Sequence, residues 1–173
     1  MKLAMIYSFL KQDLAKIEES INNTIQAQHP VLREASTQLL AAGGKRIRPV
    51  FVLLGGMFGN YRLDRMEAVA VSLELIHMAS LVHDDVVDNA QLRRGEPTIK
   101  AKWDNRIAMY TGDYIFARSL ESLSALEDPH AHRVLAKTMV ELCLGEIEQV
   151  KDKYRLDQNL RDYLLRIKRK TAL

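Results

Sequence analysis

Apolar residues recur every three or four positions along most of the chain, which is the spacing of one face of an α-helix. A first helix ends at the residues QHP, positions 28–30, and its apolar face consists of Ile6, Leu10, Leu14, Ile17, Ile21 and Ile25. Further helices are predicted over 31–42, 47–58, 65–89, 100–109, 111–126, 130–155 and 159–173. No stretch alternates between apolar and polar residues as a strand would. The pattern predicts an all-α protein, a largely antiparallel helix bundle with short connections.

A chain of 173 residues is long enough for one core, so residues 1–173 are predicted to form a single helical domain. The 25 lysines and arginines nearly balance the 22 aspartates and glutamates, which argues against nucleic acid as a partner. The most apolar window, 66–82, is interrupted by glutamate and histidine and is shorter than the ~20 residues of a transmembrane segment. The single cysteine, Cys143, is predicted to be a core residue in a reducing, cytoplasmic environment.

Acidic residues follow this apolar window in the sequence HDDVVD. On a helix over 63–89, Asp84 and Asp88 share a face with Cβ atoms about 5–6 Å apart, whereas Asp85 points elsewhere. The same polar stripe continues back to Ser80 and His77, and the apolar remainder of the helix predicts that this stripe faces an internal cleft. Two carboxylates that repel each other there would suit Mg²⁺, which takes carboxylate, water and phosphate oxygens. The alternative is a helix end whose acids meet water or pair with the arginines that follow.

Two basic clusters favour the site over that alternative. Residues 93–95, Arg-Arg-Gly, follow the aspartates, and guanidinium groups are natural partners of phosphate oxygens. The sequence GGKRIRP, residues 43–49, places Lys45 and Arg48 at a helix start, where backbone N–H groups also favour an anion. It is not a nucleotide P-loop, because arginine rather than serine or threonine follows Lys45. Together the clusters predict two diphosphate sites, one bridged by metal and one clamped directly, beside an apolar cavity.

These motifs resemble the trans-type polyprenyl diphosphate synthases. The resemblance rests on GGKRIRP (43–49), LIHMASLVHDDVVDNAQLRRG (75–95), TGDYIFARS (111–119) and Lys170-Thr171, in the family's order and spacing over nearly the whole chain. The start MKLAMIYSFL and the runs TIKAKWDNRIAMYTGDY and GEIEQVKDKY are more similar to the larger, catalytic component of the family's bacterial two-component members, which make the heptaprenyl (C35) product. The resemblance implies an isoprenoid-synthase type of helix bundle, of which residues 1–173 are the N-terminal half.

The resemblance also implies roles for individual residues. Isopentenyl diphosphate would be bound by Lys45, Arg48, His77 and Arg94. Asp84 and Asp88 would hold Mg²⁺ against an allylic diphosphate, expected to be farnesyl diphosphate, and that group would also contact Arg93, Lys170 and Thr171. The implied catalytic residues are Asp84, Asp88, Arg93 and Lys170. The product would be an all-trans polyprenyl diphosphate for quinone side chains, such as those of menaquinone, and the partner a smaller, non-identical subunit, a second copy of this chain, or both.

Other residues are assigned to product length and to structure. Ala79 and Ser80, one turn before Asp84, are small where short-chain members of the family carry a bulky aromatic residue. The resemblance therefore implies a tunnel for a medium or long product, lined by Ile76, Ala79 and Ser80. His83 lies off the carboxylate stripe and is predicted to be structural. Glu146 and Glu148 are also predicted to be structural or to support the site indirectly, because residues two apart on a helix point to different faces.

Three other functions are weighed against this interpretation. A terpene cyclase has no use for a second diphosphate site, and a purely structural protein does not explain three charged motifs. A non-catalytic subunit or fragment that binds diphosphate stays open, because the second aspartate-rich motif of the family is absent from the sequence. A truncated chain is therefore expected, with an uncovered apolar face, a tendency to associate, and no activity alone.

Overall fold

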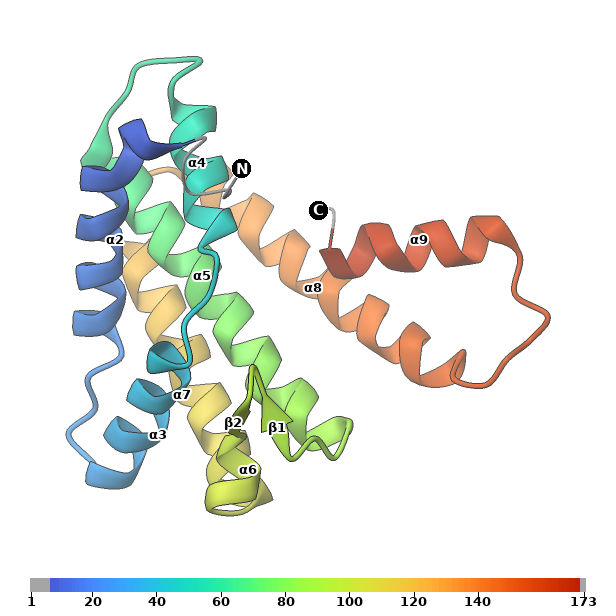
Figure 1. Cartoon of the computed structure of the whole chain (residues 1–173). Helices are drawn as coiled ribbons and strands as arrows, with labels where there is room; N and C mark the ends of the chain where they lie inside the picture. Colours follow the sequence, from blue (N-terminus) through green and yellow to red (C-terminus); the bar gives the residue numbers. More distant parts are fainter. Residues whose placement is uncertain (1–6, 172–173) are drawn as a thin grey trace. The chain divides into compact units, whose positions relative to one another are not determined.

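The computed structural model describes residues 7–171 and confirms a predominantly helical protein (Figure 1). The chain divides into two compact units, Met1–Leu126 and Glu127–Leu173. The first unit contains η1 (Ser8–Leu10), α2 (Lys11–Thr24), α3 (Pro30–Ala41), α4 (Ile47–Gly56), α5 (Leu63–Val87), β1 (Leu92–Arg93), β2 (Glu96–Pro97), α6 (Ile99–Lys102) and α7 (Asn105–Ser124). The second contains α8 (Pro129–Lys151) and α9 (Leu160–Thr171). That the two units form a single domain stays a prediction.

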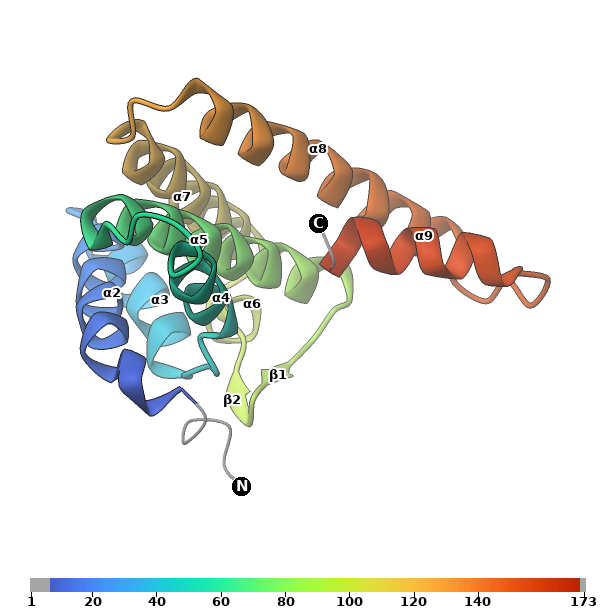
Figure 2. The ribbon, with the colours of Figure 1, turned by 90° about the horizontal axis from the view of Figure 1, so that it is seen from above.

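Helix α5 forms the core of the first unit. It packs against α2, α4 and α7, and Figure 2 shows α4 and α7 on different sides of it. Its side chains Leu75 and Ala79 are completely buried, together with Ile115 of α7. By length and composition α5 could span a membrane, but half of its most apolar window is buried inside the structure. This burial is typical of the central helix of a globular unit.

A glycine allows α7 to lie close to α5. A Cβ atom added at Gly112 would overlap Nε2 of His83 unless that ring moved. Nε2 of His83 itself lies 3.2 Å from Oδ1 of Asp113 of α7. His83 therefore joins two helices, a contact that suits a structural residue.

The helices predicted over 100–109 and 111–126 are wrong in their boundaries. The structure has a short α6, a break at residues 103–104, and an uninterrupted α7 through Gly112. The break occurs because the side chain of Asp104 accepts a hydrogen bond from the backbone N–H of Ile107 and caps α7. A two-stranded antiparallel ladder, which the pattern did not predict, follows α5.

In the second unit α8 packs against α9 through charged side chains. Arg169 forms ion pairs with Glu141 and Glu148, and Lys170 forms one with Glu146. A Cβ at Gly145 would lie 3.1 Å from the backbone nitrogen of Lys170, so glycine permits this close packing.

One side of α8 is apolar and exposed. Cys143, predicted to be a core residue, is exposed, because α9 covers only part of α8 within this unit. Other exposed apolar side chains follow one stripe of the helix: Val140, Leu144, Ile147 and Val150. This stripe fits the expectation of an uncovered apolar face.

Candidate functional site

A pocket of about 520 Å³ lies where the loop before α4, the middle of α5 and the β1–β2 turn meet. It is lined by Gly44, Lys45, Arg46, Ile47, Arg48, Glu74, His77 and Arg94. The structure therefore brings together all four residues predicted to bind isopentenyl diphosphate. They come from three segments of the chain, so their meeting depends on the fold and not on local sequence.

Left-handed backbone shapes two of these segments. Arg46 has φ 48° and immediately precedes α4, so the pocket lies at the N-terminus of that helix. Arg94 and Gly95, with φ 55° and 88°, form the tight turn between β1 and β2. A Cβ at Gly44 would lie 2.8 Å from Nη1 of Arg46 and 3.0 Å from Nη1 of Arg94, so glycine leaves room for both guanidinium groups.

One arginine of the pocket is already paired. Arg46 donates to Glu18 through Nε at 2.6 Å and Nη2 at 2.8 Å, and to Glu74 through Nη1 at 3.2 Å. The hydrogen bond with Glu18 raises the pKa of Arg46, whereas burial lowers the pKa of Arg48. Within residues 7–171, no ion pair is found for Lys45, Arg48 or Arg94. The side chains of these three residues are thus available to bind a polyanion in the pocket.

His77 contributes a neutral side chain to this cationic pocket. Burial, followed by the positive charges of Arg48, Arg94, Arg93 and Arg46, lowers its pKa to about 4. The imidazole is therefore uncharged at pH 7 and carries one N–H donor. A neutral donor can bind a phosphate oxygen without adding a fourth charge to the pocket.

The aspartates at the end of α5 occupy different environments. Asp84 is half-buried and Asp88 is exposed at the end of the helix, while Asp85 is only 4% exposed. Arg93 donates to Asp85 from Nε at 2.9 Å and lies 2.7 Å from it through Nη2. Asp85 therefore pairs with one of the arginines that follow it, and this carboxylate holds the arginine predicted to contact substrate.

Asp84 and Asp88 offer a small set of ligands for a metal. They lie one turn apart, and helical spacing puts them on the side of α5 that carries His77 and Ser80. Among residues 7–171, no three His, Cys, Asp or Glu side chains gather closely enough to hold a metal ion. A pair of carboxylates fits Mg²⁺, which usually keeps waters and takes its other ligands from phosphates.

Lys170 and Thr171 belong to the second unit, whereas the pocket residues belong to the first. Nζ of Lys170 lies 2.8 Å from a carboxylate oxygen of Glu146 and 2.9 Å from the side-chain oxygen of Gln149. Glu148 pairs with Arg169, so the contacts of both glutamates suit the structural role predicted for them. The side chain of Thr171 lies outside the described part of the chain.

The three residues predicted to line a product tunnel do not share one environment. Ala79 is completely buried in the core and Ile76 is 7% exposed. Ser80 is half-buried, and its hydroxyl donates to the backbone carbonyl of His77 at 2.8 Å. Of the three, Ser80 lies on the same side of α5 as Asp84, and the tunnel itself stays a prediction.

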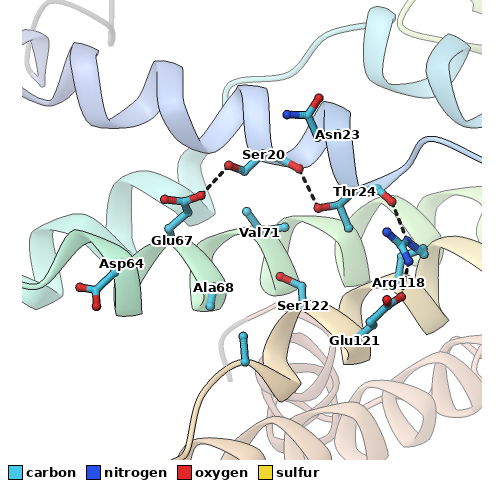
Figure 3. Close-up of a pocket in the computed structure, with 11 residues that line it drawn as sticks. Ser20, Asn23, Thr24, Asp64, Glu67, Ala68, Val71, Arg118, Glu121 and Ser122 are labelled. Carbon is cyan, nitrogen blue, oxygen red and sulfur yellow. Dashed lines mark hydrogen bonds and ion pairs between the residues drawn. The ribbon is translucent and has the colours of Figure 1, made fainter.

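A second pocket, of about 590 Å³, lies between α2, α5 and α7 (Figure 3). Ser20 of α2 donates to Glu67 of α5 at 2.5 Å, and Arg118 of α7 donates to the carbonyl of Thr24 at 2.7 Å. None of the residues predicted for substrate or metal lines this pocket. Its polar contacts hold the three helices together.

Sequence reasoning missed the carboxylates around Arg46. The sequence did indicate that Glu74 could belong to the site, because it is a charged residue inside an apolar stretch, one turn before His77. Nothing in the sequence indicated a role for Glu18, since it lies on a helix face with other polar residues. Its contact with Arg46 is formed by the tertiary fold.

Comparison with known proteins shows which family the chain resembles over most of its length. Residues 29–173 match the family model described as polyprenyl synthetase. The chain is 65% identical to heptaprenyl diphosphate synthase component 2 of Bacillus subtilis (strain 168) and 68% identical to that of Geobacillus stearothermophilus, in both cases over 100% of its length. It covers 50% and 54% of these proteins, so it spans about half the length of the curated relatives it matches.

A solved structure has the same fold. The crystal structure of heptaprenyl diphosphate synthase from Staphylococcus aureus superposes with a TM-score of 0.91 and 42% sequence identity, over 94% of this chain and 52% of that chain. The family match covers most of the sequence, and it includes the segments that form the pocket and the acidic end of α5. The chain therefore belongs to the polyprenyl synthetase family.

Proposed function

We propose that this chain supplies the isopentenyl diphosphate pocket and one Mg²⁺-binding carboxylate pair of a trans-polyprenyl diphosphate synthase. One observation carries the proposal: Lys45, Arg48 and Arg94 line one pocket of about 520 Å³ with a neutral His77, at the start of a helix. Three cations and helix N–H groups match the charge of a diphosphate monoester. By helical spacing, His77 and the carboxylate pair lie along the same side of α5.

The proposed reaction joins two diphosphates by an electrophilic condensation. The C1–O bond of the allylic diphosphate breaks and the leaving diphosphate keeps the electron pair. The double bond of isopentenyl diphosphate then forms a bond to C1, and loss of a proton restores a double bond. Since no side-chain nucleophile is needed, the chain's contribution is to position the two substrates and to stabilise the charge on the leaving group.

Asp84 and Asp88 are the residues that would hold Mg²⁺. When bound, this ion would supply positive charge to the leaving diphosphate. The buried apolar residues of α5 would help to exclude water, while the four predicted pocket residues hold isopentenyl diphosphate. The proposed contacts of the allylic diphosphate are Arg93, Lys170 and Thr171.

The proposed product and partner rest on two relatives. Both are called component 2 of a heptaprenyl diphosphate synthase, so we extend to this chain a C35 product, formed from farnesyl diphosphate for a quinone side chain. Since both relatives are named as one component of an enzyme, we extend to this chain a smaller, non-identical partner subunit. The proposed site of action is the cytoplasm. Because the chain spans half of these relatives, the second candidate is a subunit or fragment that binds diphosphate without turnover.

The test is a condensation assay with farnesyl diphosphate and labelled isopentenyl diphosphate, followed by sizing of the product. The chain is assayed alone and with a candidate partner. Asp84→Ala and Asp88→Ala should each abolish Mg²⁺-dependent condensation, because each removes half of the carboxylate pair. Asp85→Asn should cost less activity, since Asp85 binds Arg93 instead.

Two outcomes would count against the proposal. Equal activity in all three aspartate variants would remove the metal-site assignment. Binding of isopentenyl diphosphate without turnover under every condition would select the non-catalytic candidate.

A further inference from the structure

Arg46 lies between Lys45 and Arg48, the other two basic residues of the GGKRIRP motif, yet its side chain is occupied. All three guanidinium nitrogens contact carboxylates, two of them Glu18 of α2 and one of them Glu74 of α5. Few of its donors are left for a substrate. Arg46 therefore differs from Lys45 and Arg48, for which no carboxylate partner is found within residues 7–171.

The backbone at Arg46 is unusual for a residue with a side chain. Its φ of 48° and ψ of 38° lie in the left-handed region, which persists in such residues only when the surroundings hold it. The turn stands directly between Lys45 and the first residue of α4. It thus sets the direction of Lys45 relative to Arg48, which follows within the first helical turn.

Glu74 connects this turn to the wall of the pocket, which it lines. It is 3% exposed, its Oε1 accepts from Arg46, and its buried Oε2 has no hydrogen-bond partner in the described structure. Its negative charge also acts on Arg48, where it offsets part of the effect of burial on the pKa. One buried carboxylate therefore influences both arginines of the motif.

We propose that Arg46 is a positioning residue of the diphosphate pocket, held by Glu18 and Glu74 in the left-handed turn that places Lys45 and Arg48 along the pocket wall. The proposal rests on the proposed function, because it assumes that a diphosphate occupies this pocket. Arg46 binds no substrate itself. It acts through the geometry of its two neighbours in the motif.

A Glu18→Gln variant distinguishes an effect of the turn geometry on anion binding from a direct effect of charge. Glu18 does not line the pocket, and loss of its negative charge would by itself favour an anion. Weaker anion binding by a Glu18→Gln variant must then come from a disturbed turn. Arg46→Lys makes a second test, because lysine keeps the charge but lacks the planar fork that contacts both carboxylates.

Two measurements are made on the full chain. Amide hydrogen exchange of residues 44–48 reports the turn without any ligand, and calorimetric titration with inorganic pyrophosphate reports the pocket. Arg62→Lys is the matched control, since Arg62 pairs with Asp64 on the surface and does not line the pocket. Lys45→Ala is the reference for a residue that contacts the anion directly.

Glu18→Gln and Arg46→Lys should both exchange faster at residues 44–48 and bind pyrophosphate roughly tenfold more weakly, a loss typical of one charge-assisted hydrogen bond. Arg62→Lys should change neither quantity. Unchanged exchange in both variants would overturn the proposal, and so would faster exchange with unchanged affinity. If Lys45→Ala binds pyrophosphate as tightly as the unmodified chain, then the pocket is not the diphosphate site. The positioning role proposed for Arg46 would then be wrong as well.

Discussion

Neighbouring aspartates on α5 show how one step along a helix changes the role of a residue. Asp85 turns inward, is 4% exposed and binds Arg93, whereas Asp84 is half-buried on the side that carries His77. Successive helical residues point about 100° apart, so the same side-chain type meets two different surroundings. The motif DDxxD therefore combines a structural acid with two candidate ligands.

The charge state of His77 predicts a dependence of stability on pH. Its pKa is lowered to about 4 in the folded chain, against about 6.5 unfolded, so the unfolded chain binds more protons between these values. The free energy of unfolding should therefore be largest above pH 6.5 and fall as the pH drops toward 4. After allowance for the partial exposure of the ring, this residue should account for roughly 2 kcal/mol of the fall. Urea unfolding at several pH values measures the effect.

A His77→Gln variant is the control for that titration. Glutamine keeps an N–H donor but has no proton to gain in this range. Between pH 6.5 and pH 4, the unmodified chain should therefore lose more unfolding free energy than the variant does. A constant difference between the two chains would mean that His77 titrates normally in the folded chain.

At the scale of elements, the contact between α5 and α7 dominates the first unit. Ser72 supports this contact, since its hydroxyl is shared between the carbonyl of Ala68 in α5, at 2.7 Å, and that of Ser119 in α7, at 3.0 Å. Small residues at such a contact let two helix backbones approach, and larger ones hold them apart. Gly112 and Ser72 therefore both contribute to the close approach of α5 and α7.

Gly112→Ala should destabilise the first unit by about 1–3 kcal/mol, because the added methyl would displace His83. Gly55→Ala is the matched control. Gly55 also lies in a helix, but a Cβ there meets nothing within 4 Å, so alanine should be neutral or stabilising by about 0.5–1 kcal/mol. Denaturant unfolding of both variants measures the effect, and equal stability would contradict the close packing described for α5 and α7.

Helical periodicity predicts most elements because each helix repeats its apolar spacing over several turns. It fails at residues 103–104, where a single capping side chain, that of Asp104, separates one helix from the next. It also fails at Cys143, since periodicity identifies an apolar face but not whether another element covers it. The pocket residues were found through their motifs, whereas Glu18 required the tertiary fold.

At the scale of the whole molecule, the length of the product in the proposed reaction would depend on which side of α5 the growing chain follows. The chain would start at Asp84 and Asp88 and pass the residues that precede them. Ala79 lies in the core, so the side that carries Ser80 is the more accessible to such a path. The predicted tunnel can thus be tested with phenylalanine at two neighbouring positions.

Ser80→Phe should shorten the product of the condensation assay while the chain stays folded. Ala79→Phe should instead lower stability, by about 1–3 kcal/mol or more, because a ring cannot fit a completely buried alanine site. Product sizing and thermal unfolding of both variants measure the two effects. An unchanged product length with Ser80→Phe would exclude a tunnel on this side of α5.

The single helix that carries both His77 and Asp84 has a consequence for substrate selection. Seven residues of α-helix correspond to a rise of about 10 Å, and a helix of this length does not stretch. In the proposed reaction, the distance between His77, on the isopentenyl diphosphate, and the carboxylate pair that would hold Mg²⁺ is therefore set by the backbone of one helix. An analogue of isopentenyl diphosphate with one extra methylene between diphosphate and double bond would then place its double bond out of register with C1 of the allylic substrate.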